Sequence, residues 1–155
     1  TCSSKTTSYK TKKFGSTTVN AGKAYYISVR AVRNYNYKNY YSSHITNFSV
    51  VTKPSDIKNL YTSKVKSTSL RLNWSQVSSA SGYRIYYKSS KNGSWKVYKT
   101  ISNSKLKKSK GNYYISFNNL NKNRTYYVRV RAYKSNGVIQ QYGAISNTKI
   151  VRTKK

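Results

Sequence analysis

Apolar residues alternate with polar ones at a period of two in four stretches of the C-terminal two-thirds of the chain. The alternating apolar positions are Leu70, Leu72 and Trp74; Tyr83, Ile85 and Tyr87; Tyr113, Ile115 and Phe117; and Tyr126, Val128, Val130 and Ala132. Alternation over such lengths is typical of strands that bury one face. Polar turn segments separate the stretches, and no helical period competes with them. Several short strands in about 100 residues predict an all-β fold, an antiparallel β-sandwich.

An internal repeat runs through the chain. Residues 19–32 read VNAGKAYYISVRAV and residues 120–133 read LNKNRTYYVRVRAY, so that Tyr25 and Tyr126 are 101 positions apart. Tyr41 and Tyr142 keep the same offset. A fixed period of about 100 residues indicates tandem domains rather than a solenoid of short repeats.

The two copies differ in length. Residues 1–53 correspond to 102–154, and nothing before them corresponds to 55–101. Pro54, the only proline, lies where the second copy begins, and proline suits a linker or the first residue of a strand. We therefore expect residues 54–155 to form a complete module. Residues 1–53 are expected to be the C-terminal half of another module, either truncated or completed by another chain.

A half-module of this kind would expose an apolar face. The residues on that face are Val19, Tyr25, Ile27 and Val29. Leaving one such side chain exposed forgoes about 1.5–3 kcal/mol. Two explanations stay open at this point. The missing strands can belong to a separate piece of a longer chain. Alternatively the protein assembles, because two half-modules can pair face to face or a second subunit can complete the sheet by strand addition. A head-to-tail contact of the latter kind would propagate as a filament.

These segments resemble the fibronectin type III family. SLRLNW at 69–74 and GYRIYY at 82–87 resemble its B and C strands, with Trp74 as the core tryptophan. Residues 120–132 resemble its E–F corner and F strand, and YGAISNTKIVRT at 142–153 resembles its closing G strand. The resemblance implies a β-sandwich over 54–155, a partial copy over about 19–53, and a Tyr126 hydroxyl bonded to the backbone near Leu120. The usual Pro-Gly of the E–F turn is replaced by Lys122-Asn123 and, in the first copy, Ala21-Gly22.

The composition resembles a particular variety of that family. Modules rich in Lys, Ser, Thr and Tyr, with a Thr-Ser-Tyr such as the one at 7–9, are similar to tandem modules of secreted and cell-surface bacterial proteins. This resemblance implies an extracellular or cell-surface location. No apolar run approaches the roughly 20 residues of a membrane span. Cys2 is the only cysteine, so that no intrachain disulfide forms, and we expect a free thiol.

The charge balance is extreme. The chain has 31 Lys and Arg against one acidic residue, Asp56, for a net charge of +30. Internal ion pairs cannot neutralise such a chain, which therefore tolerates its own repulsion or meets an anionic partner. General acid–base chemistry has only His44 and Asp56 to draw on. Clusters of metal-ligating residues and a Gly-rich phosphate loop are both missing from the sequence. We expect no catalytic residue, no metal, no cofactor and no enzymatic activity.

The candidate binding residues are outward-facing positions of the two predicted strands that resemble the C and F strands of the family. They are Arg84, Tyr86, Lys88, Tyr127, Arg129, Arg131 and Tyr133. The family resemblance makes these strands neighbours, and cations beside aromatic rings suit anionic polymers. A second basic site is expected in the loop before the strand at 113–117. It comprises Lys105, Lys107, Lys108 and Lys110.

Several functions fit these features. The leading hypothesis is a non-catalytic module that binds or coats an anionic polymer or surface, such as a cell-wall polymer, an acidic glycan or extracellular nucleic acid. The alternative is a structural spacer or a self-assembling fibre subunit. General electrostatic stickiness is a third explanation, because outward strand positions of soluble sandwiches are usually charged and edge lysines block aggregation. An intracellular nucleic-acid protein fits the charge, but no known nucleic-acid motif is present.

Overall fold

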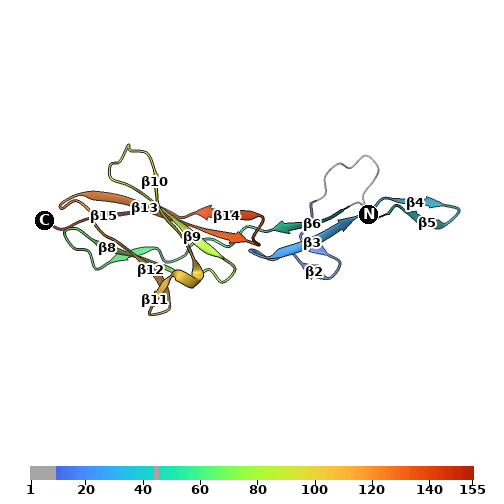
Figure 1. The fold of residues 1–155 in the computed structure, drawn as a ribbon, viewed down its shortest axis with the longest axis horizontal. Coiled ribbons are helices and arrows are strands. Elements are labelled where there is room, and N and C mark those ends of the chain that lie inside the picture. Colours follow the sequence, from blue (N-terminus) through green and yellow to red (C-terminus); the bar gives the residue numbers. More distant parts are fainter. Residues whose placement is uncertain (1–9, 44–45) are drawn as a thin grey trace.

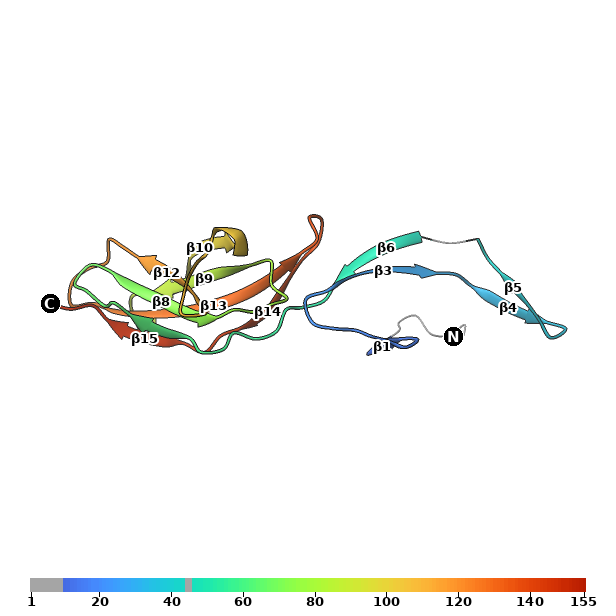
Figure 2. The same cartoon turned by 90° about the horizontal axis from the view of Figure 1, so that it is seen from below.

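The structure is a computed structural model that describes residues 10–43 and 46–155. Cys2, the Thr-Ser-Tyr at 7–9 and His44 therefore lie outside the described residues. Over the described ranges every regular element is a β-strand except η1, a single 3-10 turn at Asn103–Lys105. Figures 1 and 2 show an elongated molecule with a two-layered body near the C-terminus and N-terminal strands extending from one end of it.

The body is an antiparallel β-sandwich. One sheet has the order β11-β12-β8-β7, built from β11 (Lys107–Ser109), β12 (Asn112–Phe117), β8 (Leu70–Ser75) and β7 (Tyr61–Ser63). The other has the order β10-β9-β13-β14, built from β10 (Lys96–Ser102), β9 (Gly82–Lys88), β13 (Thr125–Ser135) and β14 (Gln140–Ile145), and β15 (Lys149–Arg152) also pairs with β13. All pairs are antiparallel. The predicted fold class is confirmed.

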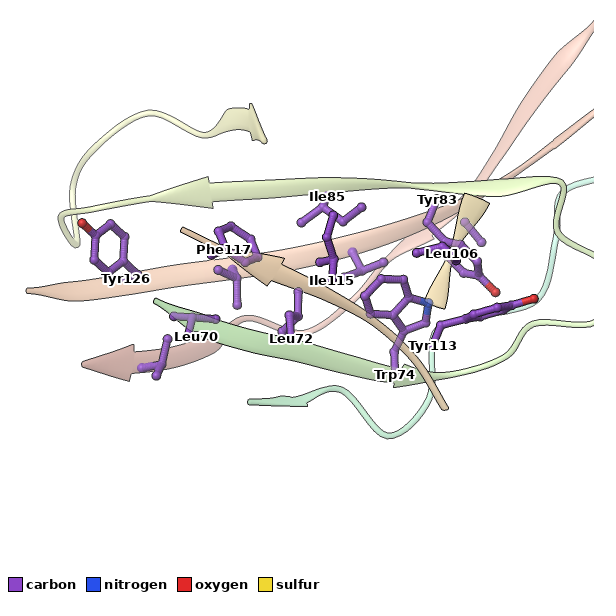
Figure 3. Packing of buried hydrophobic residues seen from close by; sticks show 14 of the residues in the cluster. Leu70, Leu72, Trp74, Tyr83, Ile85, Leu106, Tyr113, Ile115, Phe117 and Tyr126 are labelled. Atoms are coloured by element: carbon purple, nitrogen blue, oxygen red, sulfur yellow. The ribbon is translucent and has the colours of Figure 1, made fainter. Parts of the chain in front are cut away.

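The alternating stretches supply the core. Along β13 buried and partly exposed residues alternate from Thr125 to Tyr133, so that every second side chain enters the space between the sheets. Trp74 and Tyr83 are fully buried, and their rings meet edge-on with centroids 5.2 Å apart. The Val77 amide donates a 2.8 Å hydrogen bond to the Tyr83 hydroxyl, which satisfies the polar end of that buried ring. Figure 3 shows Trp74, Tyr113 and Phe117 packed within this core.

Tyr126 closes the corner before β13 as the family resemblance implies. Its hydroxyl accepts a 3.0 Å hydrogen bond from the Asn121 amide, one residue after Leu120. The turn that lacks Pro-Gly places Asn123 at φ 52°, and the corresponding Gly22 has φ 63°. Asn and Gly adopt this left-handed conformation more readily than other residues, so that each turn forms without the usual sequence.

Two expected segments differ in detail from the structure. The closing strand at 142–153 is divided into β14 and β15, because the Ser146 hydroxyl accepts the Val130 amide at 2.9 Å and interrupts the ladder. The expected loop before β12 instead contains η1 and β11, and β11 forms a hairpin with β12 through Lys110 and Gly111. Both of these residues have positive φ, which a tight hairpin turn requires.

The N-terminal strands repeat the corner of the sandwich. β3 (Ala24–Val29) pairs with β6 (Thr46–Val51), and the register Tyr25↔Val50 is that of Tyr126↔Val151 shifted by 101 residues. The Tyr25 hydroxyl accepts the Asn20 amide at 2.7 Å, which reproduces the bond at Tyr126. β4 (Val32–Tyr35) and β5 (Lys38–Tyr41) form an exposed hairpin beyond this pair.

Burial differs between the two copies. Val130 is fully buried, whereas its counterpart Val29 is 54% exposed. Val19, Tyr25 and Ile27 are only partly buried. A short ribbon of β1 (Lys13–Phe14) and β2 (Thr17–Thr18) lies against this sheet in the described part of the chain, with the rings of Phe14 and Tyr25 6.4 Å apart. The buried cluster draws its members from residues 70–151.

Candidate functional site

The register of β9 and β13 gathers the predicted outward residues on one surface. Lys88 lies opposite Tyr127, Tyr86 opposite Arg129 and Arg84 opposite Arg131. Opposite residues of an antiparallel pair share a face, and their neighbours along each strand are the buried core residues. We call this surface the cationic face. Its members are Arg84, Tyr86, Lys88, Tyr127, Arg129, Arg131 and Tyr133, together with Trp95 and Tyr142.

Trp95 lies at one end of the cationic face. It belongs to the loop between β9 and β10, and its ring centroid is 4.4 Å from the Arg129 guanidinium carbon and 5.1 Å from the Lys88 ammonium. The same ammonium lies 5.4 Å from the Tyr127 ring. Cations within about 6 Å of a ring face are attracted to it. Trp95 was not predicted from the sequence, because it precedes β10 in a loop outside the alternating runs.

Tyr142 lies at the other end, on β14. Its ring is 4.8 Å from the Arg84 guanidinium and 5.1 Å from that of Arg131, and it is 6.0 Å from the Tyr133 ring. Tyr133 in turn lies over Gly82, where an added Cβ would stand 2.5 Å from the Tyr133 hydroxyl. An added Cβ would also clash with the Ile101 carbonyl oxygen, so that a larger residue at position 82 would displace both Tyr133 and the β10 backbone.

The three arginines are held by neutral acceptors. The Nε of Arg84 donates to the Thr100 hydroxyl at 3.1 Å, that of Arg129 to the Thr148 hydroxyl at 2.7 Å, and that of Arg131 to the Gly143 carbonyl at 2.7 Å. These contacts fix the orientation of each guanidinium without neutralising its charge. The only carboxylate side chain of the protein, Asp56, borders a separate hollow with Val77 and Ser78. Direct opposition of Arg84 and Arg131 is unfavourable unless an anion or a ring screens the pair.

The second predicted basic site is not part of the cationic face. Lys105 lies in η1, Lys107 and Lys108 lie in β11, and Lys110 occupies the following turn, all at the edge of the other sheet. Lys107 lies opposite Tyr114, and the Lys108 ammonium is 5.1 Å from the Tyr113 ring. The structure therefore separates the predicted residues into two sites on different sheets.

The described residues hold no cluster of metal-ligating side chains. A search over that part of the chain finds no cluster of three or more His, Cys, Asp or Glu side chains. Within the same ranges, no helix is long and apolar enough to cross a membrane.

Comparison with known proteins supports the fold. The family model for the fibronectin type III domain matches residues 52–149. A solved structure described as a myokine structure has a TM-score of 0.52 at 15% identity and covers 66% of this chain and 100% of its own. The chicken CNTN1 FN1-FN3 domains have a TM-score of 0.53 at 20% identity, covering 88% of this chain and 45% of that chain. No curated protein matches.

Proposed function

The chain belongs to the fibronectin type III family, and from this premise we propose that it is a cationic extracellular or cell-surface module that binds anionic polymers through the cationic face. Modules of this family are generally non-catalytic, and a strand-built face suits an extended ligand. The secreted bacterial variety suggested by the composition is part of the same proposal. The ligand class comprises cell-wall polymers, acidic glycans and extracellular nucleic acid.

The observation that carries the proposal is the arrangement of Trp95 and Tyr142. Each ring lies against two cations, one from β9 and one from β13. Scattered solubilising charges need no such support. Sugars and bases stack on the faces of aromatic rings, and Trp95 and Tyr142 are both partly exposed. The cationic face therefore has the two components of polyanion recognition, charge for the backbone and aromatic surface for the units.

The binding mechanism is exchange of counterions for fixed cations. Successive outward residues of β13 are about 7 Å apart, so that an anionic chain laid along the strand meets Tyr127, Arg129, Arg131 and Tyr133 in turn. Each phosphate neutralised releases condensed counterions, and log K falls with log salt concentration with a slope of about −0.7 per contact for single strands. Affinity should then depend steeply on salt.

The test is a charge-matched pair of variants. The face variant Arg129→Gln/Arg131→Gln and the control Lys58→Gln/Lys154→Gln each remove two positive charges, and the control positions are exposed and outside the cationic face. Binding of a single-stranded oligonucleotide, a sulfated glycan and polyphosphate is measured by fluorescence anisotropy or calorimetry between about 50 and 200 mM salt. We expect the face variant to lose at least about tenfold more affinity than the control, about 1.4 kcal/mol. Equal losses in both variants would contradict the proposal in favour of general stickiness.

Trp95→Ala tests the aromatic component without changing the charge. We expect weaker binding of the oligonucleotide, by about 1–3 kcal/mol if one base stacks on the indole. Polyphosphate has no ring or sugar and should lose less affinity. If Trp95→Ala weakens polyphosphate and oligonucleotide binding equally, the ring only positions Arg129 and Lys88.

A second candidate function is assembly through the N-terminal strands. We propose that residues 1–53 are the C-terminal half of a module and that strands of another chain segment complete it. The supporting observation is that β3 and β6 keep the register and corner hydrogen bond of β13 and β15, whereas Val29 stays exposed. A fibre or spacer function follows if a second subunit supplies those strands.

Sedimentation over a range of protein concentrations tests this candidate. Association should be reversible and should be abolished by Val29→Lys, which places a charge on the open face. Tyr26→Lys, a change at an exposed position of the same strand that points to the opposite side, is the control. A monomer at every concentration would exclude self-assembly.

A further inference from the structure

A pocket of about 290 Å³ opens at the edge of the sandwich, between β10 of the sheet that carries the cationic face and β8, β11 and β12 of the other sheet. β12 pairs with β11 only over Asn112–Tyr114, and from Ile115 onward that side of the strand has no strand partner in the described residues. The pocket occupies this gap, with the buried Leu106 and Ile115 among its lining residues.

Four cations from four elements converge on the pocket. Arg71 comes from β8, Lys99 from β10, Lys105 from η1 and Lys107 from β11. Apart from these cations the lining is apolar or uncharged, and the only acidic residue, Asp56, borders a different hollow. The four cations repel one another because no carboxylate lies among them. An anion bound in the pocket would offset this repulsion.

The Tyr114 ring holds Arg71 in place, but one hydrogen-bond donor of this arginine lacks an acceptor in the described part of the chain. Its guanidinium carbon lies 3.8 Å from the centroid of the Tyr114 ring, which holds the group flat against β12. Its Nε is buried and has no hydrogen-bond acceptor among residues 10–43 and 46–155. A buried donor without a partner costs about 1–3 kcal/mol, and such a group in a folded protein calls for an acceptor that the described residues do not supply.

We propose that this pocket binds a single tetrahedral oxyanion, a phosphate or sulfate group, with Arg71 as the orienting ligand and Lys99, Lys105 and Lys107 as the neutralising cations. A volume near the lower end of ligand pockets, about 300 Å³, accommodates one such group and the small unit that bears it rather than an extended polymer. The planar fork of arginine matches two oxygens of a phosphate or sulfate, and lysines then supply charge from several directions. The site is independent of the cationic face and does not require it.

The test is a nitrogen–proton NMR titration of the full chain with inorganic phosphate, at ionic strength held constant with sodium chloride. We expect saturable shifts of the Arg71 Nε–Hε resonance and of the Ser116 and Lys107 amides. Arg71→Lys keeps the charge but loses the fork, and it should weaken phosphate binding at least tenfold while the spectrum stays that of the folded protein. Arg33→Lys, at an exposed position of β4 outside both the pocket and the cationic face, is the matched control and should leave phosphate binding at the pocket unchanged.

Two further probes identify the source of the oxyanion. Glycerol 3-phosphate is a small phosphate monoester, and inorganic sulfate is a free anion of similar shape. Tighter binding of the monoester than of either free anion indicates that the pocket takes a group carried on a larger molecule, and the reverse order indicates a free anion. Shifts that grow linearly without saturation, or that are the same in Arg71→Lys, would overturn the proposal.

Discussion

The buried Tyr83 makes the stability of the sandwich depend on pH in the alkaline range. Burial raises the pKa of Tyr83, and the hydrogen bond from the Val77 amide, which favours the phenolate, does not offset the burial. Above pH about 10 the unfolded chain releases this proton while the folded chain keeps it. The unfolded state then binds fewer protons, so that the free energy of unfolding falls as pH rises from about 10 toward the raised pKa of the folded state.

Tyr83→Phe checks this pH dependence. The variant starts less stable by about 1 kcal/mol, because the Val77 amide loses its acceptor. Between pH about 9 and 11 the difference in unfolding free energy between the two proteins should narrow, since the phenylalanine has no proton to retain. Urea denaturation at each pH measures the difference.

Single residues of the core were predictable from the sequence, and two residues of the cationic face were not. Trp74 and Tyr126 lie in alternating runs, where the period of two alone assigns the buried side. Trp95 reaches the face only because the β9–β10 connection folds back over Lys88. Tyr142 reaches it only because β14 pairs with β13 beside Tyr133. Both positions depend on tertiary pairing, which local periodicity does not encode.

At the scale of elements, β13 and β3 hold equivalent positions in the 101-residue repeat but differ in burial. Val130 and Val29 hold equivalent positions, 101 residues apart, with exposures of 0% and 54%. Val130→Ala should lower the unfolding free energy by about 2 kcal/mol, because it removes buried methyl groups and leaves a cavity. Val29→Ala should change it by no more than about 0.5 kcal/mol. Urea denaturation of both variants measures the contrast, and equal losses would show that β3 is covered in solution.

The sequence predicts the existence of the main strands better than the residues at which strands begin and end. The strands at 70–74, 83–87, 113–117 and 126–132 follow from alternation, and they are β8, β9, β12 and β13. The division between β14 and β15 was missed, because a serine hydroxyl that replaces a ladder contact leaves no pattern in the sequence. The sequence predicts a loop where β11 lies, because β11 has only three residues and two of them are lysines, which are depleted in strands.

At the scale of the whole molecule, the high positive charge opposes folding and favours the binding of anionic polymers. A net charge of +30 with one acidic residue makes the compact state repel itself, and no pairing within the chain relieves this. Simple salt screens that repulsion, because the Debye length falls from about 30 Å at 0.01 M to about 8 Å at 0.15 M. Added salt should therefore stabilise the folded chain while it weakens polyanion binding.

Thermal unfolding followed by circular dichroism separates these two effects. The Tm should rise by several degrees between about 0.01 and 0.15 M sodium chloride, because repulsion in the folded state decreases over that range. Over the same range the affinity for a single-stranded oligonucleotide should fall. The control variant Lys58→Gln/Lys154→Gln should have a smaller rise in Tm than the native chain, because it begins with less charge. A Tm that stays constant or falls with salt would contradict the view that charge repulsion in the folded chain limits its stability.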